Sequence, residues 1–375
     1  MYTKLENSIA KQKIDDDMTL ITGVILSEVK GVSAIILTGG FGRGEGSILF
    51  RNNLCQPLND YDLVIISDNH PSGQNLASIR VTLAQLCGIR QVDISLMKQK
   101  DFANMKFTMA NYDLIYASEV IYGSFDRVND IPKWEAKNLP LVEGIVPLFL
   151  FLSSIIQAYP RKKDPTSNEL FWAYQQLTKS ILGWATAMLI FKGLYDPSYY
   201  KRNKLFQKYF SNDVLLCELV NSATEFKLRP TLDPCTLSEL KVFWNTAREA
   251  HLGAMKLILP SFYKFKFSTW DYVVVRHKLS FVNLAKMLLS KVFRRHHYYD
   301  CLNTDLAKLY LCLAIGKPDD GSLAKSKRYF SMITSVKSSQ LPSSNLRQYI
   351  EQLILSDKNA QMFFERGRGS DIFYE

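Results

Sequence analysis

The chain has 375 residues, of which 47% are hydrophobic and 22% are charged. This composition is typical of a globular protein with a buried core, and it excludes global disorder. The formal net charge of +10, from 46 Lys and Arg against 36 Asp and Glu, favours anionic partners: nucleotides, nucleic acid or an anionic membrane surface. The length predicts two domains, at roughly 100–200 residues each.

The cysteines and the most apolar stretch indicate where the protein resides. None of the six cysteines forms a Cys-x-x-Cys pair or a Cys/His cluster with zinc spacing, and dispersed single thiols are typical of a reduced, cytoplasmic protein. The first residues, MYTKLENSIAKQKIDDDM, lack the apolar core of a signal peptide. Residues 139–156 are interrupted by Glu143 and Pro147 and fall short of the ~20 apolar residues of a spanning helix. We therefore expect a cytoplasmic protein without a transmembrane segment.

The first hundred residues alternate between helical and strand patterns. Helices are expected at 9–30 and 73–86, and strands at 33–38 (SAIILT), 61–66 (YDLVII) and 91–97 (QVDISLM). Such alternation is the signature of a layered α/β structure.

From about residue 131 onward the apolar residues recur at the spacing of amphipathic helices. Thr166 with Glu169 fits a capping box that opens a helix running to about Lys192. Further helical segments are expected at 237–259, 279–295, 305–315 and 345–355. We therefore predict an α+β protein, with an α/β domain built on a short mixed sheet over residues 1–130 and an all-α domain over residues 131–375.

A glycine-rich turn, GGFGRGEGS, follows the first expected strand. Paired glycines at 39 and 40 let the backbone turn sharply and approach a ligand, and amide groups in such a turn can hold phosphate oxygens. Two familiar phosphate motifs are excluded by the spacing: no lysine follows the glycines as in G-x-x-x-x-G-K-[ST], and Glu45 and Ser47 break G-x-G-x-x-G.

Three acids accompany the next two expected strands. Asp60 and Asp62 are separated by one residue, so a strand projects both carboxylates from one face. Two like charges held so close favour a bound cation, and hard oxygen ligands suit Mg²⁺ or Mn²⁺. Asp93, inside the apolar run VDISLM, also needs a charge partner. The alternative is a solvated turn before the strand and an ion pair between Asp93 and Arg90.

The ordered segments ILTGGFGRGEGS, NDYDLVI and QVDISLM resemble the DNA polymerase β-type nucleotidyltransferase superfamily. They are most similar to its bacterial small-molecule and minimal branches, which carry Gly-Ser-x-x-Arg-Gly before Ser-Asp-x-Asp-Leu. The resemblance covers residues 33–97. It departs from the family where Gly40 replaces the usual serine and where the segment 47–58 lengthens the connection to the acids.

The resemblance implies a two-part site. Its triphosphate-binding residues would be Gly39, Gly40 and Arg43, and its catalytic and metal-binding residues would be Asp60, Asp62 and Asp93. Two ions about 3.5–4 Å apart can activate an acceptor hydroxyl and stabilise the leaving pyrophosphate. Asp93 would act as, or assist, the general base on that hydroxyl.

The implied reaction is metal-dependent transfer of an NMP group from an NTP, the co-substrate, to an acceptor hydroxyl or phosphate. A small molecule, such as a sugar, an antibiotic or a polysaccharide precursor, is the first expectation for the acceptor. The alternatives are a protein-modifying or toxin-type nucleotidyltransferase, a nucleotide-second-messenger synthase or an RNA-end polymerase, and a nucleotide-binding module without activity. The basic pattern at 279–295 suits peripheral contact with an anionic membrane or with nucleic acid, or else a core helix with outward lysines.

Overall fold

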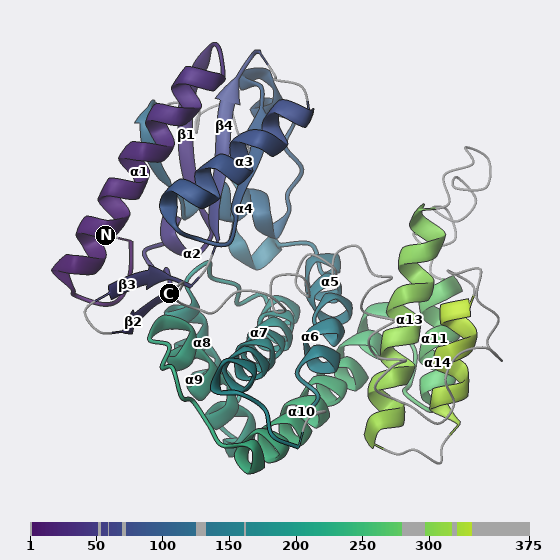
Figure 1. The fold of residues 1–375 in the computed structure, drawn as a ribbon. Coiled ribbons are helices and arrows are strands. Elements are labelled where there is room, and N and C mark those ends of the chain that lie inside the picture. The colour runs from purple at the N-terminus through teal and green to yellow at the C-terminus, as the bar shows by residue number, and fades with distance from the viewer. Residues whose placement is uncertain are drawn as a thin grey trace. The chain divides into compact units, whose positions relative to one another are not determined.

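A computed structural model of the chain describes residues 2–51, 54–58, 60–69, 73–124, 133–160, 163–279, 297–316 and 321–331 (Figure 1). The protein is mixed α+β, and it divides into two compact units that are described separately below. Unit 1 comprises Met1–Pro140 and Lys192–Leu232, and unit 2 comprises Leu141–Phe191 and Asp233–Glu375.

Unit 1 is built on a four-stranded mixed sheet in the order β5-β4-β1-β6 (Figure 1). The strands are β1 (Val32–Thr38), β4 (Tyr61–Ser67), β5 (Val92–Met97) and β6 (Glu119–Gly123). Strand β1 is antiparallel to both of its neighbours, whereas β4 and β5 are parallel. The three strands predicted from the apolar runs are confirmed as β1, β4 and β5, and so is the short mixed character of the sheet.

Alternate residues of each strand enter two different apolar clusters, which fixes what each face of the sheet covers. One face, with Leu63 and Ile94, packs against α1 (Ser8–Glu28) and α3 (Gly73–Cys87). The opposite face, with Ile36 and Val64, packs against the short helix η1 (Gln99–Asn104) and α4 (Met109–Tyr116).

A buried hydrogen bond fixes the register of β4. The hydroxyl of Tyr61 donates to Asp17 of α1 at 2.7 Å, so Tyr61 points toward the α1 face. Because successive side chains of a strand point to opposite faces, Asp62 points toward the α4 face; Asp60 directly precedes the strand. A shift of one residue would reverse this assignment for every side chain of the strand.

The segment 47–58 forms a separate antiparallel hairpin of β2 (Ile48–Arg51) and β3 (Leu54–Pro57). Ile48 and Leu49 are buried. Leu58 N donates to Ser47 O at 2.9 Å, next to the pair of Ile48 and Pro57. The lengthened connection that the sequence placed between the glycine turn and Asp60 is therefore a compact two-stranded element.

Two helices within the range 131–375, which was predicted as one all-α domain, belong to unit 1: α8 (Tyr199–Tyr209) and α9 (Val214–Leu228). Each begins at a polar cap, because Ser198 Oγ accepts from Lys201 N at 3.2 Å and Asp213 Oδ1 accepts from Leu216 N at 3.1 Å. Contacts with residues 45 and 47, described below, hold them in this unit. The contact-based division therefore differs from the predicted division at residue 130.

Unit 2 is all helical in its described part. Its helices are α5 (Val142–Leu150), α6 (Leu152–Gln157), α7 (Ser167–Phe191), α10 (Leu237–Tyr263), α11 (Trp270–Leu279), α13 (His297–Gly316) and α14 (Ser322–Ser331). The predicted capping box at the start of α7 is confirmed, since Thr166 N donates to Glu169 Oε2 at 3.0 Å and Glu169 N donates to Thr166 Oγ1 at 3.3 Å.

The core of unit 2 contains a buried histidine whose two ring nitrogens are both hydrogen bonded. His251 Nδ1 lies 2.9 Å from Ser180 Oγ, and its Nε2 lies 2.8 Å from Leu148 O. None of the helices in the described ranges combines the length and the apolar character that crossing a bilayer requires. The predicted helix at 279–295, apart from Leu279, and the predicted helix at 345–355 lie outside the described residues.

Candidate functional site

Two of the predicted acids face each other across parallel strands. In the β4–β5 register Asp62 pairs with Asp93, and both alternate with residues of the α1 face, so both carboxylates point toward the α4 face. Burial, followed by the charges of Asp60 and Asp93, raises the pKa of Asp62 from 3.8 to about 6. The structure therefore brings all three predicted acids within electrostatic range of one another.

The glycine turn lies directly against the Asp62 carboxylate. Gly39 has a left-handed backbone, with φ +64°, and a Cβ atom added there would lie 1.9 Å from Asp62 Oδ2. Thr38, the residue before it, pairs with Asp62 in the β1–β4 register and donates its hydroxyl to Asp62 O at 3.2 Å. A Cβ on Gly40 would lie 3.6 Å from Lys227 Nζ. Because Gly39 and Gly40 have no side chains, the backbone between Asp62 and Lys227 is uncovered.

Replacing Gly39 with alanine is expected to distort this site, because the methyl group must displace the Asp62 carboxylate in addition to straining the backbone. Gly88 is the matched control: its φ is +63° and nothing lies within 4 Å of an added Cβ. Each alanine should lower the free energy of unfolding by about 1 kcal/mol through the left-handed backbone. Only Gly39→Ala should lower the free energy of urea unfolding by more than this amount; equal losses for the two variants would contradict the close approach.

Three cations surround the ring of Tyr199, the first residue of α8. The distances to the ring centroid are 4.2 Å from Arg202 Cζ, 5.3 Å from Arg43 Cζ and 5.7 Å from Lys227 Nζ. Burial and the charge of Arg43 lower the pKa of Lys227 from 10.5 to about 8. Like charges gathered this closely favour an anionic ligand, whose charge relieves their repulsion.

Arg43, the predicted triphosphate ligand, is held from the α4 side. Its Nη1 lies 3.1 Å from Asp113 Oδ2, and the hydroxyl of Tyr195 donates to Asp113 Oδ1 at 2.7 Å. Burial raises the pKa of Asp113, against the opposing effect of Arg43. Among the described residues, the buried Nε of Arg43 has no hydrogen-bond partner, so this guanidinium keeps an N–H donor for a ligand.

Glu45 fastens α8 to the glycine turn. The side chain is fully buried, with 0% exposure. Its carboxylate accepts from Ser198 Oγ at 2.6 Å, Tyr199 N at 2.7 Å and Tyr200 N at 3.2 Å. The two backbone N–H groups are free donors of the first turn of α8, and an anion at a helix N-terminus is favourable.

Lys227, near the end of α9, connects the second helix to the same turn. Its Nζ donates to Ser47 Oγ at 2.9 Å, and Ser47 Oγ donates to Lys227 O at 2.5 Å. Sequence reasoning missed Lys227, because it stands 180 residues after Ser47 in an ordinary helical context, TEFKLRP. It also missed the roles of Asp113, Tyr199 and Arg202, since the local sequence around each carries no signal of the pairing. The one available signal was Glu45, an acid inside a glycine-rich turn.

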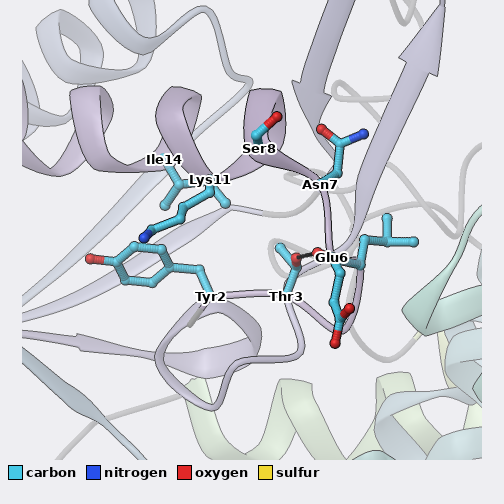
Figure 2. A pocket seen from close by; sticks show the side chains of 8 residues that line it. Tyr2, Thr3, Glu6, Asn7, Ser8, Lys11 and Ile14 are labelled. Atoms are coloured by element: carbon cyan, nitrogen blue, oxygen red, sulfur yellow. Dashed lines mark hydrogen bonds between the residues drawn. The ribbon is translucent and has the colours of Figure 1, made fainter.

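The cavity drawn in Figure 2 lies elsewhere, at the start of α1. Its volume is about 200 Å³, and its lining includes Tyr2, Glu6 and Lys11 but none of the three acids. Tyr2 O accepts from Gly46 N at 3.0 Å. The backbone of Tyr2 therefore contacts the glycine turn, whereas the side chains that line this cavity lie outside the acidic site.

The acids fit a metal that arrives with a nucleotide better than one held by protein alone. Within the described ranges, no group of three His, Cys, Asp or Glu side chains is arranged as metal ligands, so Asp60, Asp62 and Asp93 do not form one preformed ligand set. Mg²⁺ at phosphate-transfer sites is commonly bound by one or two carboxylates together with substrate phosphates. The Asp62–Asp93 pair could supply such a donor set, and like charges held together favour a bound cation.

The site thus combines carboxylates, a bare glycine turn and a cluster of cations in one unit of the chain. The argument for its function rests on this geometry and on the sequence resemblance. No family model matches the chain, and no curated protein and no solved structure matches it.

Proposed function

We propose that the protein is a Mg²⁺-dependent nucleotidyltransferase, which moves an NMP group from an NTP to an acceptor hydroxyl or phosphate. One observation carries the proposal: the register that sets Asp62 level with Asp93 on one face of the sheet, directly against the Gly39 turn. A binding module has no need of paired carboxylates beside a phosphate site, whereas phosphate transfer needs both.

The residues divide into anion-binding and metal-binding groups. Arg43 and Lys227 would bind triphosphate oxygens. Because Gly39 and Gly40 have no side chains, these oxygens would have room to approach Asp62. Asp62 and Asp93, with Asp60 beside them, would hold Mg²⁺ or Mn²⁺. When bound, the metal neutralises charge on the phosphates and lowers the pKa of the acceptor hydroxyl.

The reaction is an in-line displacement at the α-phosphorus. The acceptor oxygen forms a bond to that phosphorus, the bond to the bridging oxygen breaks, and pyrophosphate leaves. Asp93, which lies in β5 on the side of Asp62 away from β1, would receive the acceptor proton. The cations near Tyr199 stabilise the charge that develops on the leaving pyrophosphate.

Labelled nucleotides test this reaction directly. The purified protein is incubated with Mg²⁺, a cell extract as acceptor source and each NTP in turn, labelled at the α- or the γ-phosphate. We expect the α-label, and not the γ-label, on an acceptor, with this transfer lost on chelation. Transfer of the γ-label to an acceptor, or no labelled acceptor beyond that formed by the extract alone, would contradict the proposal.

Lys227 gives the triphosphate site an expected pH dependence. Its pKa of about 8 means that the ammonium is charged below this pH and neutral above it. We expect nucleotide affinity to fall as the pH rises through about 8, and Lys227→Met to lower affinity by about tenfold at neutral pH and to flatten that fall. Calorimetric titrations over this pH range, with Lys227→Arg as the charge-retaining control, measure both effects. An unchanged pH profile in Lys227→Met would contradict the assignment.

A further inference from the structure

Helix α8 presents a basic face whose charge the reaction chemistry does not use. Its sequence, YYKRNKLFQKY, contains four basic residues and no acidic one. Arg202 is buried in the Tyr199 cluster, whereas Lys201, Lys204 and Lys208 are exposed. Residues three and four apart are neighbours on a helix surface, so these three lysines lie along one side of α8.

Exposed tyrosines flank the lysines. Tyr200 is 43% exposed and Tyr209 is 47% exposed, and the two rings lie 4.4 Å from Lys204 Nζ and 5.2 Å from Lys208 Nζ. We call Tyr200, Lys201, Lys204, Lys208 and Tyr209 the α8 basic face. Lys201 Nζ lies 3.8 Å from Asp196 Oδ2, whereas Lys204 and Lys208 form no ion pair with an acid in the described ranges.

The face is continuous with the candidate triphosphate site. Tyr199, which contacts Arg43 and Lys227, directly precedes Tyr200, and Tyr200 N itself donates to Glu45 at 3.2 Å. The hydrogen bonds of Glu45 therefore fix the start of the α8 basic face relative to the glycine turn. A ligand bound along the lysines of α8 would therefore reach Arg43 and Lys227 beside Tyr199.

We propose that the α8 basic face binds single-stranded nucleic acid, with its lysines on phosphates and its tyrosines stacked on bases. Lysines interleaved with exposed aromatic rings are the combination that holds a flexible polynucleotide without reading its sequence. The exposed residues of α8 include no aliphatic side chain, which a membrane-resting helix uses to enter the acyl boundary. Resting on the proposed function, we assign the bound strand as the acceptor, in place of the small molecule expected from the sequence.

The binding test uses the full chain and a fluorescein-labelled RNA of mixed sequence, about 16 nucleotides long. Affinity is measured by anisotropy between about 50 and 200 mM salt. The triple variant K201Q/K204Q/K208Q is compared with K30Q/K100Q/K241Q, which removes the same charge from three exposed lysines elsewhere.

We expect the α8 variant to bind at least about tenfold more weakly and to lower the slope of log K against log salt by about 2, because three phosphate contacts are lost. The control variant should stay within about twofold of the unchanged protein. Y200A/Y209A should weaken binding by a factor that is the same at every salt concentration, since stacking releases no counterions. Equal losses in both triple variants would overturn the proposal.

Three further outcomes test the choice of ligand and separate the binding surface from the reaction. Binding to phosphatidylserine vesicles through the same lysines, without binding to RNA, would overturn the choice of nucleic acid. RNA binding that is lost only in the α8 variant supports the α8 basic face as the binding surface. If no nucleotide is transferred in that case, the proposed nucleotidyltransferase function is wrong and the binding surface stands. Transfer of label to a small molecule, with RNA neither bound nor labelled, would retain the function and reject the surface.

Discussion

Replacing Asp62 with asparagine is expected to lower NMP transfer by at least about a hundredfold, ~3 kcal/mol in activation free energy, while stabilising the metal-free protein. Asparagine keeps the shape of the side chain but loses the charge that attracts the metal. In the metal-free protein the same charge is unfavourable, because burial and the neighbouring acids raise the pKa of Asp62 to about 6. Activity and stability should therefore change in opposite directions.

The stability gain depends on pH. Because the pKa of Asp62 is higher in the folded chain (about 6) than its ordinary value of 3.8, the folded state binds this proton more tightly and loses stability as the pH rises through about 6. Asp62→Asn should raise the free energy of unfolding by up to ~3 kcal/mol at about pH 7 and by nothing below about pH 4, where the carboxyl is protonated in both states.

Urea unfolding in the presence of a chelator measures this gain. Asp68→Asn is the control, because Asp68 is exposed just after the same strand and its replacement should change neither stability nor activity. If Asp62→Asn is destabilising at neutral pH, the carboxylate makes favourable contacts in the metal-free protein and its proposed role is wrong.

Replacing Glu45 with glutamine is expected to lower the free energy of unfolding by about 2–4 kcal/mol. The glutamine fits the same space, but in either orientation its NH₂ group faces the backbone N–H of Tyr199 or of Tyr200, and that N–H then lacks an acceptor. The charge at the start of α8 is also lost. Because α8 and α9 carry Tyr199 and Lys227, we expect the KM for the NTP to rise more than kcat falls.

Glu225→Gln is the matched control for this variant. Glu225 lies on α9 and is 51% exposed, with its carboxylate 3.7 Å from Arg229; exposed pairs of this kind contribute at most about 1 kcal/mol. Thermal unfolding and steady-state kinetics of both variants decide the matter. A Glu45→Gln protein as stable and as active as Glu225→Gln would show that the buried carboxylate does not hold α8.

The central strands of unit 1 were predictable because their side chains are buried on both faces, which leaves long apolar runs in β1 and β4. Strand β6 was missed, since its burial pattern has no fully buried residue and an edge strand of this kind carries little apolar signal. The assignment of α8 and α9 to unit 1 depends on contacts such as Ser47–Lys227, 180 residues apart, which leave no local trace.

The candidate site also contains residues that the sequence predicts and residues that it does not. Asp60 and Asp62 are two residues apart, and this spacing alone predicts that both lie on one face of a strand. The cations are less accessible to such reasoning: Arg43 stands near the glycines and Arg202 lies three residues after Tyr199 on α8, but Lys227 reaches Tyr199 only through the packing of the later helix α9. Lys227 is the one lysine of α9, and tertiary contacts rather than the helical pattern decide that it turns inward.

The most direct test of the account is calorimetric titration of a non-hydrolysable NTP analogue into the protein, with and without Mg²⁺. The account predicts that Mg²⁺ raises the affinity of the unchanged protein by at least about tenfold, and that Asp62→Asn binds the analogue equally weakly under both conditions. An affinity that does not respond to Mg²⁺ in the unchanged protein, or a response that persists in Asp62→Asn, would contradict a metal-dependent nucleotide site at Asp62.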